Sequence, residues 1–292
     1  MLRRSALVFL VATLVLSGES LGAPAVRPVI AWQPEKLVPG SPVLFQIPAS
    51  KRIQEVSARW FGHEVTFFFA GDASGWYALA AVPVETAAGS YELAVSEKLA
   101  GGKSIEVREK IRIARATYPK IAAKVAKQFT EPDPEQLKVI NADKSVKQQT
   151  FANVTPQRLW EGSFVAPVAA PISDIFGTAR VFNGAVLSRH QGLDFGVPSG
   201  TPAGAINAGT VLLARSLYFE GNCVVIDHGQ GLLSLYLHLS EFRVKEGDEV
   251  QAHQIIGLSG GSGRATGPHL HLAVRWQGVY LDPATLLKLK IP

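Results

Sequence analysis

The sequence contains a single cysteine, and it lacks several motifs that define other classes of protein. Cys223 has no second cysteine to pair with, so the chain cannot form an internal disulfide. Because Cys223 lies in the apolar run 223–226, we expect a buried, unreactive thiol. There is no helix-turn-helix pattern, no Gly-rich phosphate loop and no platform of interleaved aromatic and basic residues. The net charge of +5 is small and scattered, so nucleic acid is not the expected partner.

The composition predicts a globular protein with a sizeable core. Hydrophobic residues make up 47% of the 292 residues and charged residues 18%, and the sequence shows neither an internal repeat nor a low-complexity tract. A chain of this length favours about two domains. The mild positive excess suits association with an anionic wall or membrane surface.

The amino terminus predicts a secretory signal peptide over residues 1–22. A short basic segment, residues 1–4, is followed by an apolar run at 6–16 and by small residues at 20–22. The run is shorter than the about 20 residues that a membrane span needs, so no stable span is expected after cleavage. An anchor that stays uncleaved is the alternative. No cysteine stands directly after the run, which argues against a lipid-modified terminus.

Residues 26–115 predict an accessory domain made of short strands. Regularly spaced strands with turn residues between them indicate a sandwich or barrel, and an immunoglobulin-like β-sandwich suits this length. Trp60 and Trp76 are candidates for a sugar-binding platform, although core packing is the commoner role of such residues. The expected strands lie at 42–47, 64–69, 76–82, 88–95 and 104–113.

Residues 116–160 predict a connector that contains one helix. The segment 131–134 has two prolines and marks a helix start, and residues 135–149 are polar and compatible with a helix. Leu137, Ile140 and Val146 give this helix only a thin apolar stripe.

Two short patterns after residue 189 carry the chemistry. His190 precedes Asp194 by four residues, and His269-Leu-His271 follows far downstream. Imidazoles and carboxylates are zinc ligands, and a catalytic zinc keeps three protein ligands and one position for water. On a strand, the rings of His269 and His271 point to the same face, so one can bind metal while the other faces the water. The His-Glu-x-x-His pattern of thermolysin-like enzymes is absent.

The surroundings of these residues resemble the LytM or lysostaphin-type zinc metallopeptidases, the M23 family of peptidoglycan endopeptidases. The resemblance covers roughly residues 165–287 and rests on several motifs in order: those at 190–203, 221–229, 236–240 and 261–271. It implies a domain over 161–292 with a large antiparallel sheet and a concave groove. The loops around 176–184 and 260–268 would form the groove walls.

The same resemblance assigns roles to individual residues. It makes His190, Asp194 and His271 the ligands of one zinc ion, and His238 and His269 the catalytic pair, with the general base undecided between them. Candidate substrate contacts are Arg180, Asn183 and Tyr236, although for Arg180 the bracing of a loop is favoured. No metal role is expected for His63, His228 or His253.

The expected function is a secreted zinc metallo-endopeptidase that cuts peptide cross-links of peptidoglycan in the periplasm or cell wall. One alternative is a catalytically silent module that activates another wall hydrolase, and the intact ligand set argues against it. A second is a zinc amidase that cuts between sugar and peptide, which the resemblance disfavours. The sequence leaves open which bond is cut, the oligomeric state, and whether the amino-terminal domain inhibits or targets the enzyme.

Overall fold

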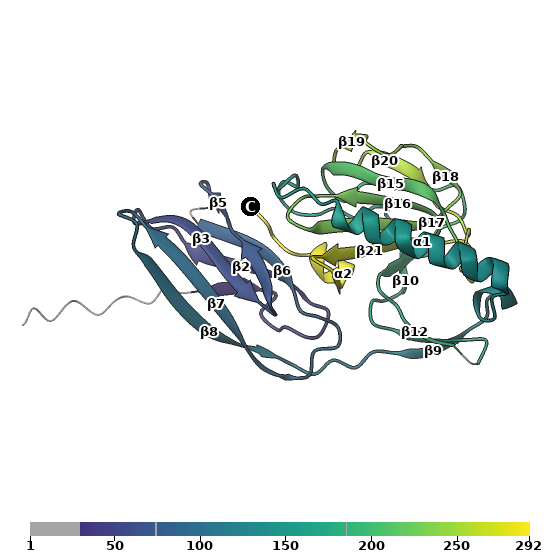
Figure 1. The fold of residues 1–292 in the computed structure, drawn as a ribbon, viewed down its shortest axis with the longest axis horizontal. Coiled ribbons are helices and arrows are strands. Elements are labelled where there is room, and N and C mark those ends of the chain that lie inside the picture. The colour runs from purple at the N-terminus through teal and green to yellow at the C-terminus, as the bar shows by residue number, and fades with distance from the viewer. Residues whose placement is uncertain (1–29, 74, 185) are drawn as a thin grey trace, which may run out of the picture.

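The computed structural model describes residues 30–73, 75–184 and 186–292, and it consists of two β-rich domains. Figure 1 shows the amino-terminal domain on the left and the carboxy-terminal domain on the right, with the connector along the lower edge and helix α1 crossing the second domain. The predicted signal peptide lies outside the described residues.

Among the helices of these ranges, none combines the length and the apolar character that a membrane crossing requires.

The amino-terminal domain is a sandwich of two four-stranded antiparallel sheets. Trp60 links them, because its Nε1 donates a hydrogen bond of 2.9 Å to the carbonyl of Ala81 and its ring packs edge-on against Phe45. Trp60 is fully buried, so core packing is its role, as favoured from the sequence. One sheet has the order β1 (Ala31–Gln33), β2 (Pro42–Pro48), β6 (Gly75–Ala81) and β5 (Phe68–Ala70); the other has β4 (His63–Thr66), β3 (Ile53–Trp60), β7 (Gly89–Leu99) and β8 (Ser104–Ile113).

The single strand expected at 64–69 is in fact two strands that belong to different sheets. Strand β4 pairs with β3, whereas β5 pairs with β6 on the opposite side of the sandwich. The chain changes sheet at Phe67, whose side chain is buried in the core between them. Such corners are a normal feature of packed sheets, but the hydrophobic pattern alone does not reveal them.

The connector contains the predicted helix and, in addition, an unpredicted strand. Helix α1 spans Pro134–Ala152 and starts with a capping box, in which Asp133 and Gln136 each accept a hydrogen bond from the other's backbone N–H. Before it, β9 (Lys120–Ala123) pairs in parallel with β11 (Ala179–Phe182) of the carboxy-terminal domain, and the short helix η1 (Lys127–Phe129) follows. The connector is therefore built into the second domain.

The carboxy-terminal domain is organised around one large antiparallel sheet, as expected. Its strands are β10 (Ile172–Asp174), β13 (Leu193–Phe195), β21 (Leu270–Trp276), β17 (Leu232–Leu239), β16 (Gly221–Asp227), β15 (Gly209–Leu217) and β19 (Glu249–Val250), in that order, with β22 (Val279–Leu281) paired to β21. Two three-stranded sheets flank it: β12 (Val186–Arg189), β11 and β9; and β14 (Pro202–Gly204), β20 (Ile255–Leu258) and β18 (Glu241–Phe242). The short helix α2 (Pro283–Leu286) follows.

Helix α1 packs on one face of this sheet. Val146 and Phe151 of the helix contact a cluster of buried side chains from the strands, and the ring of Phe151 also lies 4.3 Å from the guanidinium of Arg275. Cys223 belongs to this cluster, and burial raises the pKa of its thiol, so the expected buried, unreactive cysteine is confirmed. The strand residues of the cluster are Leu213, Leu217, Cys223, Val225, Leu233, Leu235 and Ala273.

The amino-terminal sandwich also contacts the second domain directly. The ring of His63 lies 5.3 Å from that of Trp276, and the Gln277 side chain donates to the backbone carbonyl of Glu64 at 2.7 Å. Asp282 N–H donates to the carbonyl of Gly40. His63 is thus half-buried between the domains.

We expect the Phe151→Ala variant to lower the thermal unfolding midpoint of the carboxy-terminal domain. Truncating this half-buried ring removes packing worth about 2 kcal/mol, which corresponds to about 4–8 °C. The control is Leu137→Ala, since Leu137 lies on the same helix with 45% of its surface exposed. Calorimetry that showed equal shifts for the two variants would contradict the docking of α1.

Candidate metal centre

The strand register brings two of the predicted ligands together on the sheet. Asp194 of β13 pairs with His271 of β21, and His271 pairs on its other side with Leu237 of β17. Side chains alternate between the two faces of a strand, so the neighbours Leu193 and Leu272 point into the hydrophobic core. Asp194 and His271 therefore lie side by side on the opposite face, which is also the face that α1 partly covers.

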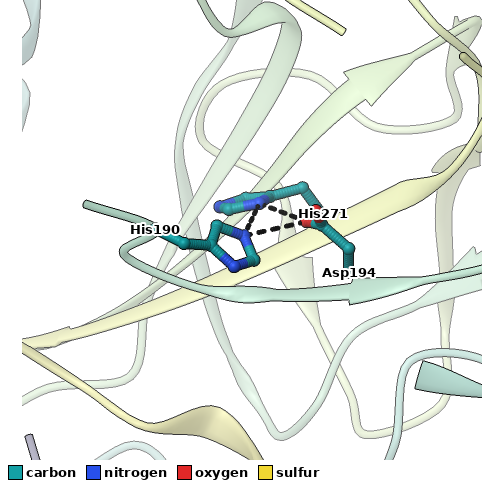
Figure 2. Close-up of side chains that lie close together, drawn as sticks. All are labelled: His190, Asp194 and His271. Carbon is teal, nitrogen blue, oxygen red and sulfur yellow. Dashed lines mark hydrogen bonds and ion pairs between the residues drawn. The ribbon is translucent and has the colours of Figure 1, made fainter. Parts of the chain in front are cut away.

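His190 completes the group from the turn between β12 and β13. Its Nδ1 lies 2.7 Å from the carbonyl of Ile175, which can only accept, so Nδ1 carries the proton and Nε2 is free. This Nε2 lies 3.0 Å from Asp194 Oδ1 and 3.1 Å from His271 Nδ1, and the last two atoms are 2.7 Å apart. Figure 2 shows the three side chains converging on one point.

Asp194 is held in its ionised form. Burial alone would raise the pKa of this carboxyl, but the hydrogen bonds and charges of His190 and His271 outweigh burial and hold the pKa well below its usual range. Its second oxygen, Oδ2, accepts from Arg180, which also binds Asp174 through two bonds of 2.8 and 2.6 Å. Arg180 thus holds the ligand carboxylate in place, a role different from the loop bracing that the sequence favoured.

His238 reaches the site through a β-bulge. Leu237 and His238 of β17 together lie opposite one residue of β16, and His238 has φ +63°. Regular alternation would place His238 on the core face with Tyr236, whereas the extra residue turns it to the face of Leu235 and Leu237. Its Nδ1 donates to the carbonyl of Ser262 at 2.8 Å, which leaves Nε2 as an acceptor.

His269 lies just before β21, on the same face as His271. Its Nδ1 donates to the carbonyl of Gly267 at 2.8 Å, and its Nε2 is buried without a hydrogen-bond partner, 3.8 Å from Asp194 Oδ1. The rings of His238 and His269 are 4.9 Å apart. Burial, together with the neighbouring His271 and His269, lowers the pKa of His238 to about 3. Two imidazoles with free Nε2 atoms thus flank the three-residue cluster.

The residues present fit a zinc ion. Two imidazole nitrogens and one carboxylate oxygen, all within 4.8 Å of one another, make a three-ligand set of the catalytic type. The second nitrogen of His190 and the second oxygen of Asp194 are both hydrogen-bonded, as outer partners of zinc ligands usually are.

Gly192 is a requirement of the site that the sequence analysis missed. A Cβ atom at this position would lie 2.5 Å from His271 Nε2 and 2.5 Å from the carbonyl of Leu272. Only glycine therefore leaves room for the ligand ring, and its place between His190 and Asp194 in the sequence is the signal that could have revealed this.

Two cavities lie beside the cluster, and the connector helps to line both. The first, of about 150 Å³, includes His190, His238 and His271 together with Lys147 of α1. The second, of about 300 Å³, includes Asp194 and His269 together with Ile121 and Ala123 of β9. Residues of the loops predicted as walls, 176–184 and 260–268, line both cavities, and the connector adds further lining residues.

Two of the candidate substrate contacts lie outside both cavities. Tyr236 is fully buried on the core face of β17, where its hydroxyl accepts from the backbone N–H of Ile206 at 2.8 Å. Asn183 lines neither cavity; its side chain bonds to the backbone of Val125 and to Thr130, which ties the connector to the β11–β12 turn. Arg180 lines both cavities.

The remaining histidines of this domain have structural surroundings. His228 is buried, donates to the carbonyl of Ala208 and contacts the hydroxyl of Ser234, and burial lowers its pKa to about 4. His253 is an exposed turn residue with φ +67°, as expected.

Comparison with known proteins places this site in a family. Residues 188–283 match the sequence model described as Peptidase family M23. Residues 188–283 form an M23 peptidase domain. The resemblance noted in the sequence is thereby confirmed over this region, which contains all five residues of the cluster and its flanking pair.

Individual relatives show the same similarity. Peptidoglycan DD-endopeptidase ShyA of Vibrio cholerae is 45% identical over 106 residues, which cover 36% of this chain and 24% of the relative. DD-carboxypeptidase/endopeptidase Mpg of Neisseria meningitidis is 39% identical over 97 residues, covering 33% and 22%. The matches thus span about a quarter of these relatives. This chain is also similar in structure to a crystal structure from Pseudomonas aeruginosa that is named a peptidase M23. The two structures match with a TM-score of 0.66 and 28% sequence identity, over 86% of this chain and 95% of that one.

We expect Gly192→Ala to abolish stoichiometric zinc binding, because the added methyl group displaces the His271 ring. The matched control is Gly196→Ala, two residues beyond Asp194, where a Cβ would make only ordinary contacts of 3.6 and 3.7 Å. Metal analysis of both folded proteins is the measurement. Full zinc occupancy in Gly192→Ala would show that the ring position is not needed for the metal.

Proposed function

We propose that this protein is a secreted, zinc-dependent endopeptidase that hydrolyses peptide cross-links of bacterial peptidoglycan. The observation that carries the proposal is the convergence of His190, Asp194 and His271, with the free Nε2 atoms of His238 and His269 beside them. Two relatives that are similar over this domain are named as endopeptidases, one of them a peptidoglycan DD-endopeptidase, which supports peptidoglycan peptides as the substrate class.

The ligand residues would hold the metal through His190 Nε2, Asp194 Oδ1 and His271 Nδ1. When bound at such a site, zinc polarises the scissile carbonyl and lowers the pKa of a water molecule to about 7. Arg180 keeps the Asp194 carboxylate oriented, and the carbonyl of Ile175 fixes the tautomer of His190.

His238 and His269 move the proton. In each ring Nδ1–H is committed to a backbone carbonyl, so Nε2 is the atom that accepts the proton of the attacking water. The ring that accepts it then donates it to the leaving amine, as general acid–base catalysis requires. The companion ring would steady the oxyanion, which forms on the carbonyl oxygen, when its own Nε2 carries a proton that it can donate.

The cellular location follows from the same proposal. Cross-links of peptidoglycan lie outside the inner membrane, and the predicted signal peptide at 1–22 would deliver the protein there. The net charge of +5 favours contact with an anionic wall. We therefore place the protein in the periplasm or at the cell wall, with peptidoglycan peptides as its partner.

Analysis of muropeptide products by mass spectrometry separates this function from its alternatives. The zinc-loaded protein should expose new amino groups within cross-linked peptides. Release of whole stem peptides from glycan would identify an amidase. Absence of new ends, combined with stimulation of a second hydrolase, would identify a silent activator and overturn the proposal.

Removing any one of the three ligands should remove both the metal and the activity. His190→Ala, Asp194→Ala and His271→Ala each leave two ligands, which is too few for a stable site of this kind. Zinc content and cross-link cleavage are measured on the same preparation. Stoichiometric zinc with normal turnover in one variant would refute the role of that residue.

The flanking pair should behave differently. His238→Ala and His269→Ala are expected to keep zinc but to lose activity on the order of 10²–10⁴-fold, the usual contribution of an acid–base group. Loss of zinc from His269→Ala would instead show that His269, rather than its neighbour at 271, is the ligand.

A further inference from the structure

Arg264 lies in the loop before β21 and lines both cavities. Its loop is fixed to the turn between β15 and β16, because the backbone N–H of Arg264 donates to the carbonyl of Phe219 at 2.9 Å. It lines the first cavity together with His238 and His271, and the second together with His269 and Asp194. A group held by Arg264 therefore lies in the same cavities as the reacting bond.

Arg264 differs from the other basic residues of these cavities in having no acidic partner. Lys147 pairs with Glu220, Arg180 with Asp174 and Asp194, and Arg189 with Glu85. Within the described ranges, no carboxylate oxygen lies within the 4.0 Å of an ion pair from Arg264. Its positive charge is thus available to a ligand.

The guanidinium is nevertheless held in place. It lies 4.8 Å from the ring centre of Phe182 and 4.7 Å from that of Phe219, so two aromatic faces contact it. The pKa of Arg264 lies below its ordinary value, chiefly because the group is buried. The charge of Glu220 opposes this shift, and the charge of Arg180 adds to it. A partly desolvated cation without a counter-ion is costly, and an anionic ligand would offset that cost.

We propose that Arg264 binds a carboxylate of the substrate peptide near the scissile bond and so makes the enzyme selective for acidic peptides. The planar fork of a guanidinium matches a carboxylate through two parallel hydrogen bonds, and a fork already positioned by two rings loses little freedom on binding. This inference rests on the proposed function, since it names the substrate class of the same site. A peptide offers two sources of the carboxylate: its carboxy terminus and an acidic side chain.

The test compares matched peptides with the full chain and with variants. The probes are D,D-cross-linked peptide dimers in three forms: free acid, amidated at the side-chain carboxyl beside the cross-link, and amidated at the carboxy terminus. The variants are Arg264→Gln, which removes the charge, and Arg264→Lys, which keeps the charge but not the fork. The control is Arg215→Gln, because Arg215 is an exposed arginine that pairs with Glu246 outside both cavities.

Two readouts are taken: kcat/KM of the zinc-loaded protein, and equilibrium binding of the probes to the metal-free protein. We expect wild type and Arg215→Gln to prefer the free acid over one amidated form by on the order of 10–100-fold. The amidation that causes the loss identifies the source of the carboxylate. Arg264→Gln should treat acid and amide alike, and Arg264→Lys should keep only part of the preference.

The outcomes separate the inference from the proposed function. Equal binding and cleavage of all three probes by wild type would overturn the role of Arg264 while leaving the peptidase intact. A preference that persists unchanged in Arg264→Gln would overturn it as well. Carboxylate-dependent binding that is lost in Arg264→Gln, without any cleavage by the wild type, would support the inference and contradict the endopeptidase function.

Discussion

The site depends on the antiparallel register between β13 and β21. Because side chains alternate with a period of two, a slip by one residue would move Asp194 and His271 from the cavity face into the core. The flanking Leu193, Phe195, Leu270 and Leu272 all belong to the buried cluster, so such a slip would expose four apolar side chains and bury charge. The hydrophobic core thereby specifies where the ligand atoms lie.

The other side chains of the site reach the cavity face through local irregularities around this pair of strands. His190 enters from a turn, and the glycine at 192 makes space for the His271 ring. His238 needs a bulge and a left-handed backbone, since a regular strand would send it to the wrong face. These features are local departures from ideal strands, and each brings a polar side chain to the cavity face.

The remaining part of that face is not open, because α1 packs on it. The helix has only a thin apolar stripe in its sequence, yet Val146 and Phe151 dock on a cluster of strand side chains. Its Lys147 lines the first cavity, where it pairs with Glu220. The connector thus limits the groove at one end and, through β9, forms a wall of the second cavity.

Much of this architecture could be predicted from the sequence, and what could not has a physical explanation. The large antiparallel sheet that the resemblance implied is present, and its central strands β16, β17 and β21 are buried apolar runs. Helix α1 starts where its proline and capping residues indicate. Strand β9 was missed because its partner, β11, lies about sixty residues further along the chain, and pairing of this kind leaves no local pattern. The position of Tyr236 could not be predicted, because the bulge places its side chain and that of His238 on opposite faces of the sheet.

The most direct test of the account is a crystal structure of the zinc-loaded protein with anomalous data collected at the zinc edge. The account predicts one anomalous peak, at about 2.0–2.1 Å from His190 Nε2 and His271 Nδ1 and about 2.0–2.2 Å from Asp194 Oδ1. His238 and His269 should direct their Nε2 atoms toward the fourth position without coordinating the metal. A peak coordinated by either of these two histidines, or the absence of a peak at this cluster, would contradict it.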